Sequence, residues 1–200
     1  VHVAMEGRYA GYLLIADVVK PHSAAAIKGL KQAGVRKTVM LTGDAEPVAK
    51  AVSAELGLDE YHAGLLPGDK VDQIEKLIAE KRPKENLAFV GDGINDAPVL
   101  SRADIGIAMG GVGSDTALQA ADVVVMKGDP LAVPLGMMLS QATERIIVQN
   151  IVLILGVKIL VMVLGILGLA GMWAAVMADV GVCLLAVGNS MRIFRVKLDM

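Results

Sequence analysis

Three oxygen-bearing side chains lie within five positions of one another in a glycine-rich stretch of the chain. Asp92, Asn95 and Asp96 occur in the sequence Gly-Asp-Gly-Ile-Asn-Asp-Ala-Pro, where they follow the apolar run Leu87–Gly91. Carboxylate and amide oxygens are hard ligands that suit Mg²⁺, which commonly shares a substrate phosphate. The structural alternative is a turn with a helix cap, but that explains a cluster of three poorly. We therefore predict that this stretch binds Mg²⁺.

A second polar stretch, Thr42-Gly43-Asp44, also ends an apolar run, and a helical pattern begins directly after it. The first amide groups of a helix lack partners within the helix and suit a phosphate group, to which a Thr hydroxyl could also donate. The alternative is a turn in which Asp44 caps the helix, and this stretch alone does not decide between the two. Lys70 lies between the stretches and could neutralise a transferring phosphoryl group, although a single lysine is more often only solvated.

The elements that must position these residues are short apolar runs that alternate with helical patterns. The predicted strands are Tyr12–Ala16, Thr38–Thr42, Leu87–Gly91, Asp104–Ala108 and Asp122–Met126, and the predicted helices cover residues 22–33, 45–57, 68–80, 95–102 and 114–120. This alternation predicts an α/β fold, a doubly wound parallel sheet with helices on both faces. Ligands of such sheets bind beyond the carboxyl ends of the strands, where both polar stretches lie.

Hydrophobic residues make up 54% of the 200 residues, and residues 146–191 carry almost no charge. We expect two domains, an α/β domain over residues 1–140 and a membrane domain with a short cytoplasmic tail over residues 141–200. At about 1.5 Å per residue, Ile146–Ala170 and Trp173–Met191 can each cross a lipid bilayer as a helical hairpin. We expect the helical pattern that begins at Asp129-Pro130 to run without a break into the first of these segments.

Basic residues predict the orientation of the hairpin. The basic residues that lie shortly before the first apolar segment or after the second are Lys127, Arg145, Arg192, Arg195 and Lys197. Because they all flank the same side, the positive-inside preference predicts that the hairpin ends and the α/β domain are cytoplasmic.

The overall charge and the ends of the chain limit the partners. The net charge of −2 gives no support for a nucleic-acid partner, and a single cysteine excludes an internal disulfide. Because no signal peptide precedes the α/β part, we expect that part to stay in the cytoplasm. Because the sequence starts at Val1, we expect it to be a fragment of a longer chain.

Lys158 and Asp179 interrupt the two apolar helices. A charge inside a bilayer is costly and usually marks a transport pathway or a pair. Counted from Gly171, Lys158 lies about 20 Å deep and Asp179 about 12 Å, so the two could pair until a cation at Asp179 replaces the lysine. A purely structural ion pair is the alternative. Cys183 follows Asp179 by one turn, but we interpret it as a packing residue rather than a ligand.

The polar stretches resemble successive signature motifs of P-type ATPases, which belong to the haloacid-dehalogenase superfamily. The resemblance extends from about Gly11 to Arg192. It implies that Asp92 holds the catalytic Mg²⁺ and that Asn95 and Asp96 support this site. It further implies that Thr42 and Lys70 bind phosphoryl oxygens, within a loop that includes Gly43 and Asp44, and that ATP binds largely outside this chain.

The last helices resemble those of the zinc, cadmium and lead branch of heavy-metal P-type ATPases, at Met177-Ala178-Asp179-Val180-Gly181 and Lys158. The Tyr-Asn and Met-Ser-Ser patterns of copper pumps and the His-Glu-Gly motif of cobalt pumps are absent from these helices. The resemblance implies export of Zn²⁺, Cd²⁺ or Pb²⁺ across a membrane, which we expect to be the plasma membrane, with Asp179 as a ligand and Lys158 as a counter-ion.

The sequence lacks the Asp-Lys-Thr-Gly-Thr motif that carries the phosphorylated aspartate of this family. We therefore expect the chain to need the missing N-terminal part of the pump and to be inactive alone. Two alternatives stay open at this point: a non-catalytic truncated or regulatory fragment of such a pump, and a membrane-tethered phosphatase of the same superfamily. The phosphatase would need an Asp-x-Asp motif, which the sequence also lacks.

Overall fold

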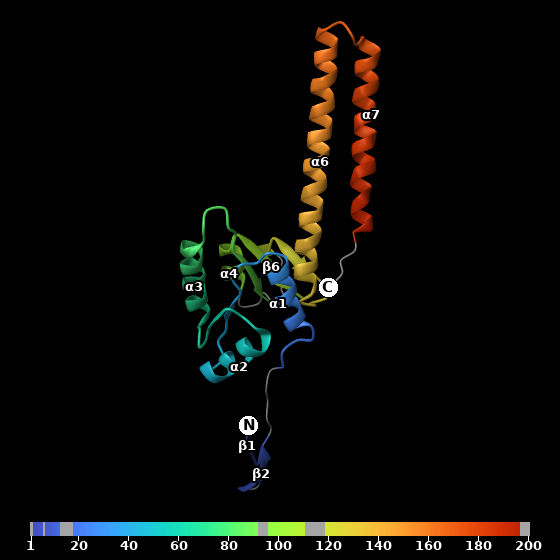
Figure 1. Ribbon diagram of the computed structural model, residues 1–200. Coiled ribbons are helices and arrows are strands. Elements are labelled where there is room, and N and C mark those ends of the chain that lie inside the picture. Colours follow the sequence, from blue (N-terminus) through green and yellow to red (C-terminus); the bar gives the residue numbers. More distant parts are fainter. Residues whose placement is uncertain (1, 6, 13–17, 92–95, 111–118, 197–200) are drawn as a thin grey trace. The chain divides into compact units, whose positions relative to one another are not determined.

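The computed structural model describes all residues except 1, 6, 13–17, 92–95, 111–118 and 197–200 (Figure 1). The chain divides into two compact units. The first contains residues 1–27 and 37–130, and the second contains residues 28–36 and 131–200. The predicted domain boundary between residues 140 and 141 stays a prediction.

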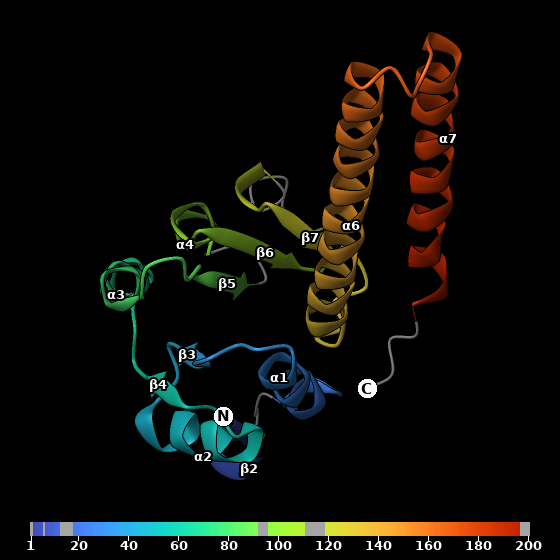
Figure 2. The same cartoon turned by 45° about the horizontal axis from the view of Figure 1, so that its top comes forward.

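Strands and helices alternate through the first unit (Figures 1 and 2). The strands are β1 (His2–Met5), β2 (Arg8–Tyr12), β3 (Val39–Leu41), β4 (Glu60–His62), β5 (Ala88–Gly91), β6 (Ile105–Met109) and β7 (Val123–Val125). Its helices are α2 (Glu46–Leu56), α3 (Pro67–Glu80) and α4 (Ala97–Arg102). Helix α1 (Ser23–Gln32) begins in this unit and ends in the second, to which residues 28–36 belong. Strand β3 pairs in parallel with β4, and β6 pairs in parallel with β5 and β7, whereas β1 and β2 form an antiparallel hairpin.

The parallel pairing confirms the predicted α/β fold, with differences in detail. The described parallel strands form two groups, β3-β4 and β5-β6-β7, rather than one hydrogen-bonded sheet. The β1-β2 hairpin and β4 were not predicted, since β4 has only three residues, of which two are polar. Of the strand predicted at Tyr12–Ala16, Tyr12 ends β2 and the other residues lie outside the described part. Among the described strands, only β6, the central strand of its sheet, has a buried middle.

The core of the first unit lies where α3 and α4 pack together and α4 packs on β6. Ile74, Val99 and Leu100 are at most 2% exposed there. Gly106 allows this packing, because a Cβ atom on it would lie 2.6 Å from the backbone oxygen of Leu100. The glycine therefore brings β6 against α4, and α4 in turn begins at Asp96, one of the predicted site residues.

The second unit is a helical hairpin made of α6 (Ala132–Ile166) and α7 (Met172–Ser190), followed by the 3₁₀ helix η1 (Met191–Arg195) (Figure 1). Both long helices are long and apolar enough to cross a membrane. The continuous α6 confirms the prediction of one helix that runs without a break into the apolar segment. In the first half of α6, Gln141 Nε2 donates a hydrogen bond of 2.8 Å to the backbone oxygen of Ala33.

Candidate functional site

The loop after β3 holds Thr42 and Asp44 against each other. The Thr42 hydroxyl donates to Asp44 Oδ2 at 2.7 Å, and the Asp44 amide donates back to Thr42 Oγ1 at 3.1 Å. Ala45, not Asp44, is the N-cap of α2, and no side chain caps that helix. The capping alternative for Asp44 is therefore wrong, and the Thr42 hydroxyl must leave Asp44 before it can donate to a phosphate group.

Backbone hydrogen bonds fix this loop to the segment that follows β4. The Thr42 amide donates to the His62 oxygen at 3.0 Å, and the Leu65 amide donates to the Thr42 oxygen at 3.0 Å. The Gly64 amide donates to the Asp44 oxygen at 2.8 Å. A Cβ atom on Gly43 would lie 3.3 Å from the Leu65 oxygen, so this position favours glycine. The backbone of the loop is therefore fixed, whereas the Thr42 side chain is half-buried and the Asp44 side chain is exposed.

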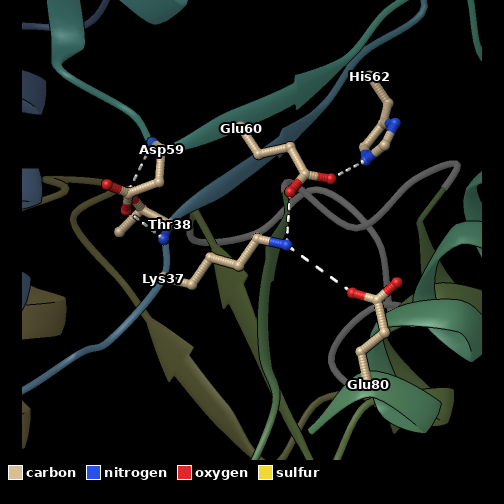
Figure 3. A network of polar contacts seen from close by, with 6 residues as sticks. All are labelled: Lys37, Thr38, Asp59, Glu60, His62 and Glu80. Carbon is tan, nitrogen blue, oxygen red and sulfur yellow. Dashed lines mark hydrogen bonds and ion pairs between the residues drawn. The ribbon is translucent and has the colours of Figure 1, made fainter.

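Figure 3 shows a polar network along β3 and β4, next to this loop in the sequence. Thr38 donates to Asp59 Oδ2 from its amide at 2.8 Å and from its hydroxyl at 2.7 Å. Lys37 Nζ lies 2.5 Å from Glu60 Oε2, and His62 Nε2 lies 2.8 Å from Glu60 Oε1. The Lys37 ammonium is the main cause that holds the pKa of the Glu60 carboxyl below its ordinary value.

This network was missed by the sequence analysis, because its residues carry no motif. A signal was present: Glu60 and His62 alternate around Tyr61, which puts their side chains on one face of a strand. The network joins β3 to β4, and it thereby supports the loop at the end of β3.

Lys70 and Asp96 form a largely buried ion pair. Lys70 lies in the first turns of α3, which begins at Pro67, and Asp96 is the N-cap residue of α4. Lys70 Nζ lies 2.8 Å from Asp96 Oδ1, and the two side chains are 19% and 12% exposed. A Cβ atom on Gly91 would lie 2.8 Å from Asp96 Oδ2, so the glycine that ends β5 makes room for this carboxylate. The structure brings together two site residues that are 26 positions apart.

The predicted Mg²⁺ ligands Asp92 and Asn95 lie outside the described residues. Among the described residues, no group of three or more His, Cys, Asp or Glu side chains could hold a metal ion. The residue types suit Mg²⁺, because Asp92 and Asn95, which follow β5 directly in the sequence, carry the hard oxygen ligands that this ion prefers. Asp96 contributes a carboxylate with one oxygen already bound to Lys70.

Lys158 of α6 and Asp179 of α7 form an ion pair between the two helices of the hairpin. Lys158 Nζ lies 2.9 Å from Asp179 Oδ1, as the length of a lysine side chain allows. The side chains are 53% and 55% exposed, so the pair lies on the outer surface of the hairpin. Cys183 is also exposed. The predicted pair is therefore present, and about half of its surface is open to a ligand or to further helices.

The haloacid dehalogenase-like hydrolase family matches residues 1–104 of the chain. The chain is similar to a zinc-transporting ATPase of Synechocystis sp., with 56% identity over 193 residues, which are 96% of this chain and 27% of the relative. It is also similar to a cadmium, zinc and cobalt-transporting ATPase of Bacillus subtilis, with 52% identity over 98% of this chain and 28% of the relative.

The structure is similar to the crystal structure of a zinc-transporting PIB-type ATPase. The TM-score is 0.81 at 41% identity, and the match covers 96% of this chain and 31% of that chain. The chain thus spans about a quarter to a third of the length of the relatives it matches.

Proposed function

The chain belongs to the haloacid dehalogenase-like hydrolase family, and from that premise we propose that it forms part of an ATP-driven pump for divalent heavy-metal ions. The observation that carries this proposal is the Lys158–Asp179 ion pair between two helices that can cross a membrane. A soluble hydrolase of this family does not need charged side chains on helices that can cross a membrane, where charges are costly and usually mark transport pathways. The zinc- and cadmium-transporting relatives support the same function.

At the metal side, Asp179 is proposed as a ligand of the transported ion and Lys158 as the counter-ion of the empty site. The ammonium neutralises the carboxylate at 2.9 Å while no cation is bound. A divalent cation that binds the Asp179 carboxylate displaces the Lys158 ammonium, because two positive charges only a few ångströms apart repel each other. A carboxylate ligand favours a borderline divalent ion over Cu(I).

The proposed cargo is Zn²⁺ or Cd²⁺, and Pb²⁺ is included because it shares the divalent charge. The Bacillus subtilis relative's name also includes cobalt, so Co²⁺ belongs among the ions that are assayed. The proposed location is the plasma membrane. The α/β unit is proposed to lie in the cytoplasm, because the basic residues Arg145 and Arg192 flank the same side of the two apolar segments.

At the phosphorylation side, Thr42 and Lys70 are proposed to bind the oxygens of an aspartyl phosphate. Lys70 is well suited to this, because its ion pair with Asp96 holds the ammonium in one place before the phosphoryl group arrives. Asp92, Asn95 and Asp96 would hold Mg²⁺, which supplies charge neutralisation on the phosphoryl oxygens when it is bound. The aspartate that accepts the phosphoryl group lies outside this sequence, since the sequence has no Asp-Lys-Thr-Gly-Thr motif.

Zinc-stimulated ATP hydrolysis by the complete pump tests this proposal. We expect Asp179→Ala to abolish the stimulation by zinc, because it changes the proposed metal site. We expect Lys70→Met to abolish ATP hydrolysis itself, because it changes the proposed phosphorylation site. Lys76→Met is the matched control, since Lys76 belongs to the same helix as Lys70 and forms no described ion pair. Undiminished zinc stimulation in Asp179→Ala would remove Asp179 from the transport site. We further expect the 200-residue chain alone to show no ATP hydrolysis.

A further inference from the structure

The short helix η1 at the end of the hairpin has an apolar side and a basic side. Residues three apart lie above one another in a 3₁₀ helix, so Met191 lies over Phe194 and Arg192 lies over Arg195. Met191 is 61% exposed and Phe194 is 87% exposed. Both arginines are exposed as well, whereas Ile193 is half-buried, in a turn that packs against both α6 and α7. The turn thus presents apolar and cationic groups side by side.

Hydrogen bonds to the hairpin hold one of these arginines in place. Arg192 Nη1 donates to Asn189 Oδ1 of α7 at 2.9 Å and to Gln149 Oε1 of α6 at 3.4 Å. Arg145 precedes Gln149 by four residues, so it lies on the same face of α6, one turn closer to the start of the helix. Three guanidinium groups, of Arg145, Arg192 and Arg195, are therefore carried by the part of the hairpin where α7 ends beside the first half of α6.

These guanidinium groups lie next to few compensating charges. Among the described residues, neither Arg145 nor Arg195 forms an ion pair, and Arg192 binds only neutral amide oxygens. Glu144 is the one acidic side chain of α6, and it is adjacent to Arg145. This part of the hairpin therefore has a positive net charge that the described residues of the second unit do not neutralise.

The three arginines also lie at the border of the apolar surface. The exposed apolar side chains of α6 that follow Arg145 begin directly after it with Ile147 and Val148, and those of α7 extend to Val187. Arg192 and Arg195 follow within the next turns. In a membrane, this border falls at the level of the phospholipid headgroups, where arginine forms paired hydrogen bonds with phosphate.

We propose that Arg145, Arg192 and Arg195 bind the phosphate group of an anionic phospholipid in the cytoplasmic leaflet. Met191 and Phe194 insert beside its acyl chains, as the apolar face of an interfacial helix does. Because Arg192 also bonds to both helices, the bound lipid fastens the end of α7 to α6. The proposal rests on insertion of the hairpin into a membrane and not on metal transport.

Native mass spectrometry of the detergent-solubilised chain, titrated with phosphatidylglycerol or with phosphatidylcholine, tests the proposal. We expect tighter binding of phosphatidylglycerol. Each basic residue near an anionic lipid contributes about fivefold in affinity, so Arg145→Gln/Arg195→Gln is expected to weaken phosphatidylglycerol binding by about 25-fold. Phosphatidylcholine binding should not change. This double variant removes no described contact, and circular dichroism at 222 nm checks that its helices are intact.

Lys50→Gln/Lys76→Gln serves as the matched control, because it removes two exposed basic residues of the first unit, in α2 and α3, that form no described ion pair. Equal affinity for the two lipids, or an unchanged phosphatidylglycerol affinity in the double variant, would overturn the proposal. An equal loss in the Lys50→Gln/Lys76→Gln control would do the same, because it would mean that overall charge and not this cluster binds the lipid. None of these measurements involves zinc or ATP, so their failure is distinct from a failure of the proposed pump function.

Discussion

The buried Lys70–Asp96 pair gives the sharpest prediction about the α/β unit. Removing one partner of a buried ion pair costs about 3–5 kcal/mol, because the other charge is left without a partner. Since the side chains of Lys70 and Asp96 keep 19% and 12% exposure, water relieves part of this cost. We therefore expect Lys70→Met to destabilise the surrounding structure by about 2–3 kcal/mol.

Hydrogen–deuterium exchange of the detergent-solubilised chain measures this change where it arises. The amides of Val99 and Leu100 donate to the backbone oxygen of Asp96, so peptides that cover α4 and β6 report on the pair. A loss of about 2–3 kcal/mol accelerates their exchange by about 30- to 160-fold. Lys76→Met is the control and should leave exchange unchanged within about threefold, the range of ordinary surface substitutions.

A double-mutant cycle separates the ion pair from the loss of a side chain. Lys70→Met/Asp96→Asn removes both charges and leaves no uncompensated ion, so its cost should be at least about 1.5 kcal/mol smaller than the sum of the single variants. Additive costs, or a Lys70→Met variant that exchanges like the wild type, would refute the reasoning from burial and distance.

Three further predictions follow from packing, pH and the hairpin. Gly106→Ala should destabilise the first unit by about 1–3 kcal/mol, because the new Cβ atom would lie 2.6 Å from the Leu100 backbone oxygen. Gly68→Ala is the control and should not lower the melting temperature, because a Cβ atom there has no neighbouring atom within 4 Å. The backbone amide of Leu87 and the Lys81 ammonium hold the pKa of Asp104 below its ordinary value. These contacts contribute stability at pH values above the pKa of this carboxyl in the unfolded chain, about 4, and the contribution is lost as the pH falls through the lowered pKa of the folded state. Since Asp104→Asn lacks the carboxyl, its melting temperature should fall less in acid than that of the wild type. Asn150→Leu removes hydrogen bonds between α6 and α7 and should lower the stability of the hairpin by about 1–2 kcal/mol. The fluorescence of the single tryptophan follows unfolding of the hairpin in detergent. An unchanged unfolding transition would show that these hydrogen bonds do not stabilise the hairpin.

The sequence was sufficient for features that depend on local geometry. The alternation of apolar runs and helical patterns predicted the parallel strands β3, β5, β6 and β7, because period and turn residues are local properties. The Lys158–Asp179 pair was predicted by counting along two helices with a fixed rise per residue. A hairpin leaves few ways to arrange two charges, so the structure agrees with the count.

Contacts between distant segments could not be predicted. Nothing near Lys70 indicates that its partner is Asp96, because that contact depends on α3 packing beside α4. The hydrogen bond from Thr42 to Asp44 is local, but a turn with Asp44 as helix cap satisfies the same residues, and only the backbone of Ala45 decides against it. The Glu60–His62 contact is also local, and the alternation of the two residues around Tyr61 indicates it only once this three-residue segment is known to be a strand.

ATP-driven uptake of radioactive zinc into inside-out membrane vesicles tests the central claim most directly. The vesicles contain the complete pump, either unchanged or with Asp179→Ala, and Lys127→Gln serves as a control with one surface charge removed. We predict zinc accumulation in the unchanged pump and in the control, and no accumulation above the ATP-free level in Asp179→Ala. Zinc uptake by Asp179→Ala at the rate of the unchanged pump would contradict the account, because transport would then not need the carboxylate that pairs with Lys158.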